Sequence, residues 1–195
     1  MDERNLNIEK ERRIFRKAKT EDIPVIVEIY SQIHEEEKRG SLYVGWLLDV
    51  YPTADTAETA LKRQDLFVCE EEGIVLASAI INQLQVDVYE DGDWRYWGSE
   101  EEVMVLHTLA VSPNAARKGV GSGFVKFYEE YARKKGCSVL RMDTNEQNII
   151  ARELYRKLGY LEAGIVPCEF NGILGVNLVL LEKNFKKNDN EKECF

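Results

Sequence analysis

The sequence has few of the residues that build metal sites and disulfide frameworks. Among its 195 residues are only two histidines, His34 and His107, and four scattered cysteines without a CxxC pair. Neither a Cys/His zinc site nor a disulfide framework is therefore expected. No apolar run approaches the ~18 residues of a membrane span, and the first residues, MDERNLNIEKERR, lack the apolar core of a signal peptide. These absences predict a soluble, cytoplasmic protein without a bound metal ion.

Positively charged residues are outnumbered by acidic ones. The sequence has 26 Lys and Arg against 35 Asp and Glu, a formal net charge of −9. Nucleic-acid-binding domains usually present a basic face, so this balance argues against a nucleic acid as partner. Hydrophobic residues, however, make up 44% of the chain, which is enough for the core of one domain. We assign residues 14–183 to that domain and expect the polar ends, 1–13 and 184–195, to be flexible.

Hydrophobic periodicity and turn residues divide the expected domain into strands and helices. Helices are expected at 20–40, 53–64, within 114–136 and at 146–159. Strands are expected at 14–18, at 65–86 as a hairpin turning at Glu72–Gly73, and at 102–111, 138–145, 160–166 and 172–183. A strand–helix–strand unit over 102–143 requires a parallel pair with a right-handed crossover, whereas the hairpin is antiparallel. The sequence thus predicts a mixed α/β sheet with helices on both faces.

A glycine-rich turn follows the expected strand 102–111 and begins the next helix. Three glycines alternate in ARKGVGSG, residues 116–123. Their spacing fits neither the Walker pattern GxxxxGK[ST], nor the dinucleotide pattern GxGxxG, nor the nucleophile elbow GxSxG. The amides of a helix N-terminus, with Arg117 and Lys118 beside them, would still form a seat for a phosphate. From this loop alone, a plain strand-to-helix turn with two solvated cations is the alternative.

Two segments, in the right order and at the right separation, carry a family resemblance. LAVSP (109–113) followed by ARKGVG (116–121) resembles a Q/R-x-x-G-x-G/A loop after a strand, and NIIARELYRKLGY (148–160) resembles an N-x-x-A-x-x-L-Y-x-x-x-G-F/Y helix. Both patterns are typical of the GNAT superfamily of acetyl-CoA-dependent N-acyltransferases. One position departs, since Ala116 stands where the family usually has Gln or Arg. The resemblance covers residues 14–183 and implies the GNAT fold, a mixed, mostly antiparallel sheet with a splayed central parallel pair.

The resemblance implies a donor and a reaction. Acetyl-CoA would give its acetyl group to a primary amine, with the pyrophosphate on the loop amides and the pantetheine arm beside the strand 102–111. Asn148 and Tyr155 would line the far side of the arm. The residues expected to bind acetyl-CoA are Leu109, Ala110, Val111, Arg117, Lys118, Gly119, Val120, Gly121, Ser122, Asn148 and Ala151. A non-catalytic acyl-CoA-binding or regulatory module on the same fold is the alternative.

Attack of an amine on a thioester sets the chemistry that the site must supply. The amine must be neutral, the carbonyl oxygen needs hydrogen-bond donors, and the leaving thiolate needs a proton or a hydrogen bond. His107 is the candidate base, directly or through a water, because its unperturbed pKa is about 6.5. A histidine packed inertly in the sheet is the alternative. The resemblance makes Tyr155 the general acid, and the backbone amide of Leu109 or Ala110 is the expected oxyanion donor.

The acceptor is expected opposite the cofactor, between the first two helices and the loop 85–101. This loop is rich in aromatic residues and carboxylates, and the segment 40–52 carries Trp46 and Tyr51. Aromatic residues with carboxylates suit a cationic amine. A solvated acidic loop is the alternative. The predicted acceptor-binding residues are Trp46, Tyr51, Asp143 and Asn145. Small-molecule and peptide amines both fit, and the sequence leaves open whether the chain forms a homodimer.

Overall fold

In the computed structural model, residues 13–185 are described and form one seven-stranded sheet with helices on both faces. The strands are β1 (Arg13–Lys17), β2 (Leu66–Glu71), β3 (Ile74–Asn82), β4 (Val103–Val111), β5 (Val139–Asn145), β6 (Leu161–Phe170) and β7 (Ile173–Asn184). The helices are α2 (Ile23–Lys38), α3 (Ala54–Arg63), α4 (Val120–Lys134) and α5 (Ile149–Lys157), with 3-10 turns between some elements. Of the ends predicted to be flexible, residues 1–12 and 186–195 lie outside the described residues.

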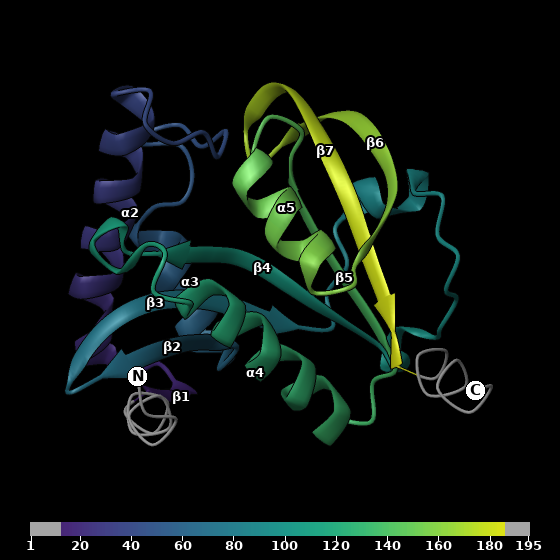
Figure 1. Cartoon of the computed structure of the whole chain (residues 1–195), viewed down its shortest axis with the longest axis horizontal. Helices are drawn as coiled ribbons and strands as arrows, with labels where there is room; N and C mark the ends of the chain where they lie inside the picture. Colours follow the sequence, from purple (N-terminus) through teal and green to yellow (C-terminus); the bar gives the residue numbers. More distant parts are fainter. Residues whose placement is uncertain (1–12, 186–195) are drawn as a thin grey trace, which may run out of the picture.

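The sheet has the strand order β1-β2-β3-β4-β5-β7-β6 (Figure 1). Among the described strands, β4 and β5 form the one parallel pair, and every other neighbouring pair is antiparallel. The parallel pairing runs from Val103 opposite Val139 to Leu106 opposite Met142 and stops there. Beyond this point β4 stays with β3 and β5 stays with β7, so the two central strands separate. The predicted mixed sheet with a splayed parallel pair is confirmed.

A β-bulge lies on β4 just past the point where the strands separate. Ile80 of β3 is opposite His107, but Ser78 is opposite Ala110, so β4 has one extra residue. Thr108, within the bulge, has a φ of 51°. Because side chains alternate between the two faces of a sheet, an extra residue moves every following side chain of that strand to the other face. As a result Leu109 packs toward α4 and α5, whereas Ala110 is buried on the opposite face.

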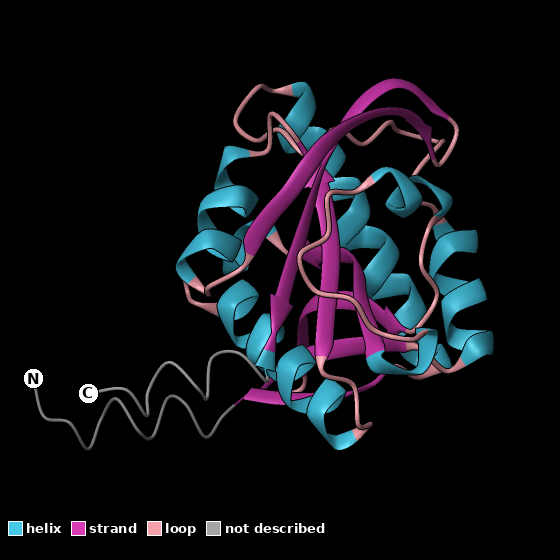
Figure 2. Cartoon of the chain, turned by 90° about the vertical axis from the view of Figure 1, so that its right-hand side faces the viewer, coloured by secondary structure: helices cyan, strands magenta, loops and turns pink. Residues whose placement is uncertain are grey.

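Both faces of the sheet are covered because strand residues alternate between two apolar clusters. Phe67 and Cys69 of β2 pack with α4 and α5, and Leu66 and Val68 pack with α2 and α3. The buried residues of α4 recur at helical spacing and are Val120, Phe124, Val125, Tyr128 and Ala132. In Figure 1, α4 and α5 lie in front of the sheet and α3 lies behind it; Figure 2 shows helices on either side of the strands. The predicted helices on both faces are confirmed.

The C-terminal half of the sheet differs from the expected boundaries. β6 continues to Phe170 instead of ending near residue 166, and it forms a long hairpin with β7. β7 extends to Asn184, and Phe185 is buried beneath the guanidinium of Arg133, whose carbon lies 3.8 Å from the ring centroid. At the other end, Arg13 already pairs with Glu71 in the sheet. The first and last strands thus each begin or end one residue beyond the predicted range 14–183. None of the described helices has the length and apolar composition that a membrane crossing requires.

Candidate functional site

Three adjoining cavities meet where β4 and β5 separate. A groove of about 790 Å³ runs along the N-terminus of α4, the exposed side of α5 and the end of β4. A central cavity of about 100 Å³ shares Trp46, Leu109 and Tyr155 with the groove. A far pocket of about 440 Å³, between α3 and the tip of the β6–β7 hairpin, shares Tyr51, Thr108, Asp143 and Phe170 with the central cavity. The fold therefore places three cavities with shared walls in a row, from one side of the fork to the other.

The loop at the N-terminus of α4 forms one end of the groove. Gly119 caps the helix in the left-handed conformation, with a φ of 76°, and Val120 is the first helical residue. Backbone amides in the first turn of a helix have no partner within the helix, and the helix end carries partial positive charge. A guanidinium nitrogen of Arg13 on β1 donates a 2.8 Å hydrogen bond to the Lys118 carbonyl. This contact joins the loop to β1, and the same guanidinium pairs with Glu71 at 3.1 Å. The helix end itself is suited to an anionic ligand.

Most of the residues predicted to bind the cofactor line the groove. They are Leu109, Val111, Arg117, Gly119, Val120, Gly121, Ser122, Asn148 and Ala151. Two predicted residues do not line it: Ala110 is fully buried on the other face of the sheet, and Lys118 lies outside the lining. Ala110 could therefore take part only through its backbone. Gly123, in contrast, sits against the sheet, because a Cβ there would lie 3.2 Å from the ring of Phe15.

Helix α5 brings Asn148, Ala151 and Tyr155 to both the groove and the central cavity. The side-chain oxygen of Asn148 accepts a 3.2 Å hydrogen bond from the Ala151 amide and so caps the helix. Tyr155 is 6% exposed, and burial raises the pKa of its phenol. Among the described residues, no group forms a hydrogen bond with its hydroxyl. The phenol therefore stays protonated at neutral pH and is free to donate to a ligand.

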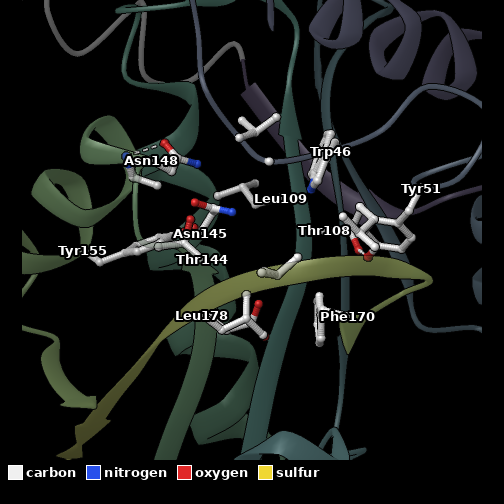
Figure 3. A pocket seen from close by; sticks show the side chains of 16 residues that line it. Trp46, Tyr51, Thr108, Leu109, Thr144, Asn145, Asn148, Tyr155, Phe170 and Leu178 are labelled. Carbon is white, nitrogen blue, oxygen red and sulfur yellow. Dashed lines mark hydrogen bonds between the residues drawn. The ribbon is translucent and has the colours of Figure 1, made fainter. Parts of the chain in front are cut away.

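The segment between α2 and α3 forms the opposite wall of the central cavity. The carboxylate of Glu37 accepts hydrogen bonds from the amides of Val44 and Gly45 at 3.2 and 2.7 Å, which folds this segment over the sheet. Trp46 and Tyr51 then contact each other edge to face, and the Tyr51 hydroxyl is hydrogen-bonded to Thr108 in the bulge. Figure 3 shows Trp46, Tyr51 and Thr108 on one side and Asn145, Asn148 and Tyr155 on the other. The predicted acceptor residues are brought together here: Trp46, Tyr51, Asp143 and Asn145 all line the central cavity.

His107 lines the far pocket and is absent from the lining of the central cavity. Its Nε2 lies 3.1 Å from the Leu84 carbonyl oxygen. A carbonyl can only accept, so Nε2 donates and Nδ1 is left as the acceptor. Burial lowers the pKa of His107 to about 4. The ring is thus neutral at pH 7 but a weak base, and the role of His107 as the base stays a prediction.

The sequence of residues 26–160 matches the family model described as the acetyltransferase (GNAT) family. The match spans more than half of the chain. The protein belongs to the acetyltransferase (GNAT) family.

Similar proteins include two curated relatives and several solved structures. YhfO, an uncharacterized N-acetyltransferase of Bacillus subtilis, is 25% identical over 147 residues, covering 75% of this chain and 89% of YhfO. An aminoglycoside N(6')-acetyltransferase type 1 of Klebsiella aerogenes is 35% identical over 66 residues, or 34% of this chain and 43% of that protein. A GNAT-family acetyltransferase structure from Streptococcus agalactiae has a TM-score of 0.75 at 22% identity, covering 88% of this chain and 95% of that one. YncA of Salmonella typhimurium, solved with its cofactor acetyl-CoA, has a TM-score of 0.62 at 20% identity, covering 89% and 94%. These structures confirm the predicted GNAT fold.

Three residues of this GNAT site were not found from the sequence. Arg13 reaches the α4 loop from the first strand, far away in the chain. Thr108 sits in the bulge and bonds Tyr51. Tyr89, which the sequence places only in an aromatic and acidic loop, is 3% exposed and donates a hydrogen bond to Asp143. Each contact joins segments more than 50 residues apart, for which local sequence patterns carry no signal.

Proposed function

We propose that this protein transfers an acetyl group from acetyl-CoA to a primary amine by direct attack in a ternary complex. The observation that carries the proposal is the meeting of the groove, the central cavity and the far pocket at the fork of β4 and β5. A donor in the groove and an amine in the far pocket would meet in the central cavity. Membership of the GNAT family and the acetyl-CoA in the Salmonella relative support acetyl-CoA as the donor.

The groove is suited to the pyrophosphate and pantetheine of acetyl-CoA. The phosphates would contact the amides of Val120, Gly121 and Ser122, where the helix end favours negative charge. Arg117, in the lining of the groove, adds positive charge in place of the long polar side chain that Ala116 lacks, whereas the charge of Arg13 is largely offset by Glu71. The pantetheine arm would follow the end of β4, whose hydrogen bonds to β5 stop at Leu106. The thioester would then lie in the central cavity beside Tyr155.

The reaction sets three tasks in the central cavity, and two of them can be assigned to named groups. Holding a lysine-like amine neutral at pH 7 costs about 4.6 kcal/mol, so a group near the amine must lower that cost or take its proton. The Leu109 amide, next to the bulge, is the proposed donor to the developing oxyanion. Tyr155 would donate a hydrogen bond to the thiolate as it leaves. Its raised pKa disfavours complete proton transfer, which could follow from solvent.

The far pocket supports a small polar amine as acceptor. Hydroxyl and amide groups line it together with the carboxylate of Asp143. Arg63, also in the lining, is paired with Asp65 at 2.8 Å, so its charge is largely offset. The pocket therefore favours a cationic or hydroxyl-bearing amine over an anionic one. A peptide N-terminus would have to enter through the same pocket.

A thiol-release assay with acetyl-CoA and a panel of small amines and peptide N-termini tests the proposal. We expect CoA release that depends on both the amine and the enzyme. If calorimetry shows that acetyl-CoA binds but no amine increases CoA release, the chain is a non-catalytic acyl-CoA-binding module instead. If acetyl-CoA does not bind, the assignment of the groove is wrong as well.

A further inference from the structure

One carboxylate lies directly at the fork of the sheet. The parallel pairing of β4 with β5 ends at Leu106 opposite Met142, and Asp143 is the next residue on β5. Its side chain lines both the central cavity and the far pocket. An amine entering from the far pocket toward a thioester in the central cavity must therefore pass this carboxylate. His107, the candidate from the sequence, faces the far pocket alone.

The carboxylate of Asp143 is held in place by a buried tyrosine from a different part of the chain. The Tyr89 hydroxyl donates a 2.8 Å hydrogen bond to Oδ2 of Asp143. Tyr89 lies in the 3-10 helix Asp87–Asp91 and is 3% exposed. Since a phenol donates one proton, the second oxygen of Asp143 is left to interact with the cavity.

The loop that carries Tyr89 is itself anchored to the sheet. Trp94 donates a 2.6 Å hydrogen bond from Nε1 to the Tyr89 carbonyl, and the guanidinium of Arg141 lies 4.0 Å from a Trp94 ring centroid. The fully buried carboxylate of Glu182 accepts the amides of Arg95 and Tyr96 at 2.8 and 3.0 Å. The bonds to Glu182 are charge-assisted, and such bonds are stronger than those between neutral groups. The Tyr89 hydroxyl is thus held in a fixed position against Asp143.

We propose that Asp143 is the base that accepts the proton of the acceptor amine, and that Tyr89 is the residue that positions its carboxylate. The proposal rests on the proposed acetyl transfer. As the amine nitrogen bonds to the thioester carbon, the carbonyl electron pair moves to oxygen and the nitrogen becomes strongly acidic. Its proton passes to Asp143, the oxyanion re-forms the carbonyl, and the C–S bond breaks. The products are an acetamide and the CoA thiolate, which Tyr155 stabilises with a hydrogen bond until it takes a proton from solvent. Asp143 releases its own proton to solvent through the far pocket.

The surroundings of Asp143 set its protonation. Burial raises the pKa of Asp143 to about 6, and the hydrogen bond from Tyr89 opposes that rise. Other titratable or charged groups that interact with Asp143 or line the same cavities are Tyr51, Tyr155, Cys168, His107, Asp55 and Arg63, and Arg141 interacts with Tyr89. A carboxylate with this pKa is ionised at pH 7 and is a stronger base than His107. Below about pH 6 it becomes protonated and can no longer accept the amine proton.

The pH dependence of kcat, measured with acetyl-CoA and an amine found in the thiol-release assay, tests both roles. For the wild type we expect kcat to fall below about pH 6. Asp143→Asn should reduce kcat ~10²- to 10⁴-fold and remove this acidic limb of the pH profile, that is, the fall of kcat at low pH. Tyr89→Phe keeps the ring and loses only the hydrogen bond, so the limb should move up by roughly 1–2 pH units. Tyr131→Phe is the matched control, because this tyrosine of α4 packs against Phe67 and lines neither the central cavity nor the far pocket; it should leave the profile unchanged.

A second measurement does not depend on the acceptor. In NMR spectra of the CoA-bound protein with ¹³C-labelled aspartate carboxyl groups, the Asp143 signal is identified as the one that Asp143→Asn lacks. This signal should titrate near pH 6 in the wild type and at a higher pH in Tyr89→Phe. Titration near the unperturbed ~3.9 overturns the proposal. So does an Asp143→Asn variant with wild-type kcat, which would leave the acetyl transfer itself intact. If the wild type acetylates no amine, the proposed function fails, and the role of Asp143 fails with it.

Discussion

Replacing Gly121 with glutamate should remove acetyl-CoA binding while leaving the fold intact. A Cβ at this position would lie 3.4 Å from Leu154 and 3.7 Å from Val111, which is ordinary van der Waals contact. The backbone therefore accepts a side chain, and Gly121→Ala should fold and bind normally. The longer glutamate side chain must project from the first turn of α4 into the groove. Its carboxylate would occupy the place proposed for the pyrophosphate.

The size of the effect follows from the charges. Two unit charges ~6 Å apart at an effective dielectric constant of ~20 repel by about 3 kcal/mol. This corresponds to a Kd about 100-fold weaker before any steric clash is counted. The effect on the stability of the fold has the opposite sign, because an acidic residue in the first turn of a helix stabilises the helix by about 0.3–1 kcal/mol. Gly121→Glu should therefore melt no lower than Gly121→Ala.

Calorimetric titration of acetyl-CoA into Gly121→Glu, Gly121→Gln and Gly121→Ala at low ionic strength separates charge from size. Glutamine is nearly isosteric with glutamate and has no charge. We expect binding in the order Ala, Gln, Glu, with the step from Gln to Glu carrying most of the loss. Equal affinity of the Gln and Glu variants would refute the phosphate seat at the start of α4.

Three further predictions concern turnover and stability. Tyr155→Phe should lower kcat more than it weakens acetyl-CoA binding; an equal kcat would make Tyr155 a packing residue. His107→Gln should leave the pH profile of kcat unchanged between pH 6 and 8, because the pKa of His107 is about 4. Asp22→Asn should destabilise the fold by about 2 kcal/mol, since Arg16 bonds this carboxylate at 2.7 and 2.9 Å and lowers its pKa. The difference in stability between the wild type and Asp22→Asn, measured by thermal unfolding, should have its full size above about pH 4. It should vanish at lower pH as Asp22 becomes protonated. A difference that does not change with pH would contradict this role of the ion pair.

Local patterns predicted the elements of the sheet well, and tertiary contacts explain the differences. The helix at 120–134 has its apolar residues at helical spacing, and its start is set by Gly119. The expected helix 146–159 is shorter in the structure because Asn148 caps it and α5 begins at Ile149. β6 runs to Phe170 because it pairs with β7 along its whole length. The sequence of β6 alone contains no signal for this pairing.

The site was predictable where a motif lies on one loop or one helix. Gly119, Gly121 and Tyr155 are in contiguous motifs and line the groove as expected. The bulge at Thr108 was not predictable, because it depends on the register between β3 and β4. It decides that Leu109, and not Ala110, faces the groove.

The protonation states could not be predicted either, since burial sets them. From its ordinary pKa, His107 was the natural candidate for the base, but burial lowers its pKa and raises that of Asp143. The same low-dielectric surroundings favour the neutral form of both groups. Burial therefore makes the histidine a weaker base and the aspartate a stronger one.

A crystal structure with CoA and an active amine tests most directly whether the three cavities form one path across the fork. We predict the pyrophosphate on the amides of Val120–Ser122, the CoA sulfur within hydrogen-bond distance of the Tyr155 hydroxyl, and the amine nitrogen within hydrogen-bond distance of Asp143. A CoA sulfur that points away from the central cavity, or an amine bound outside the far pocket, would contradict this arrangement.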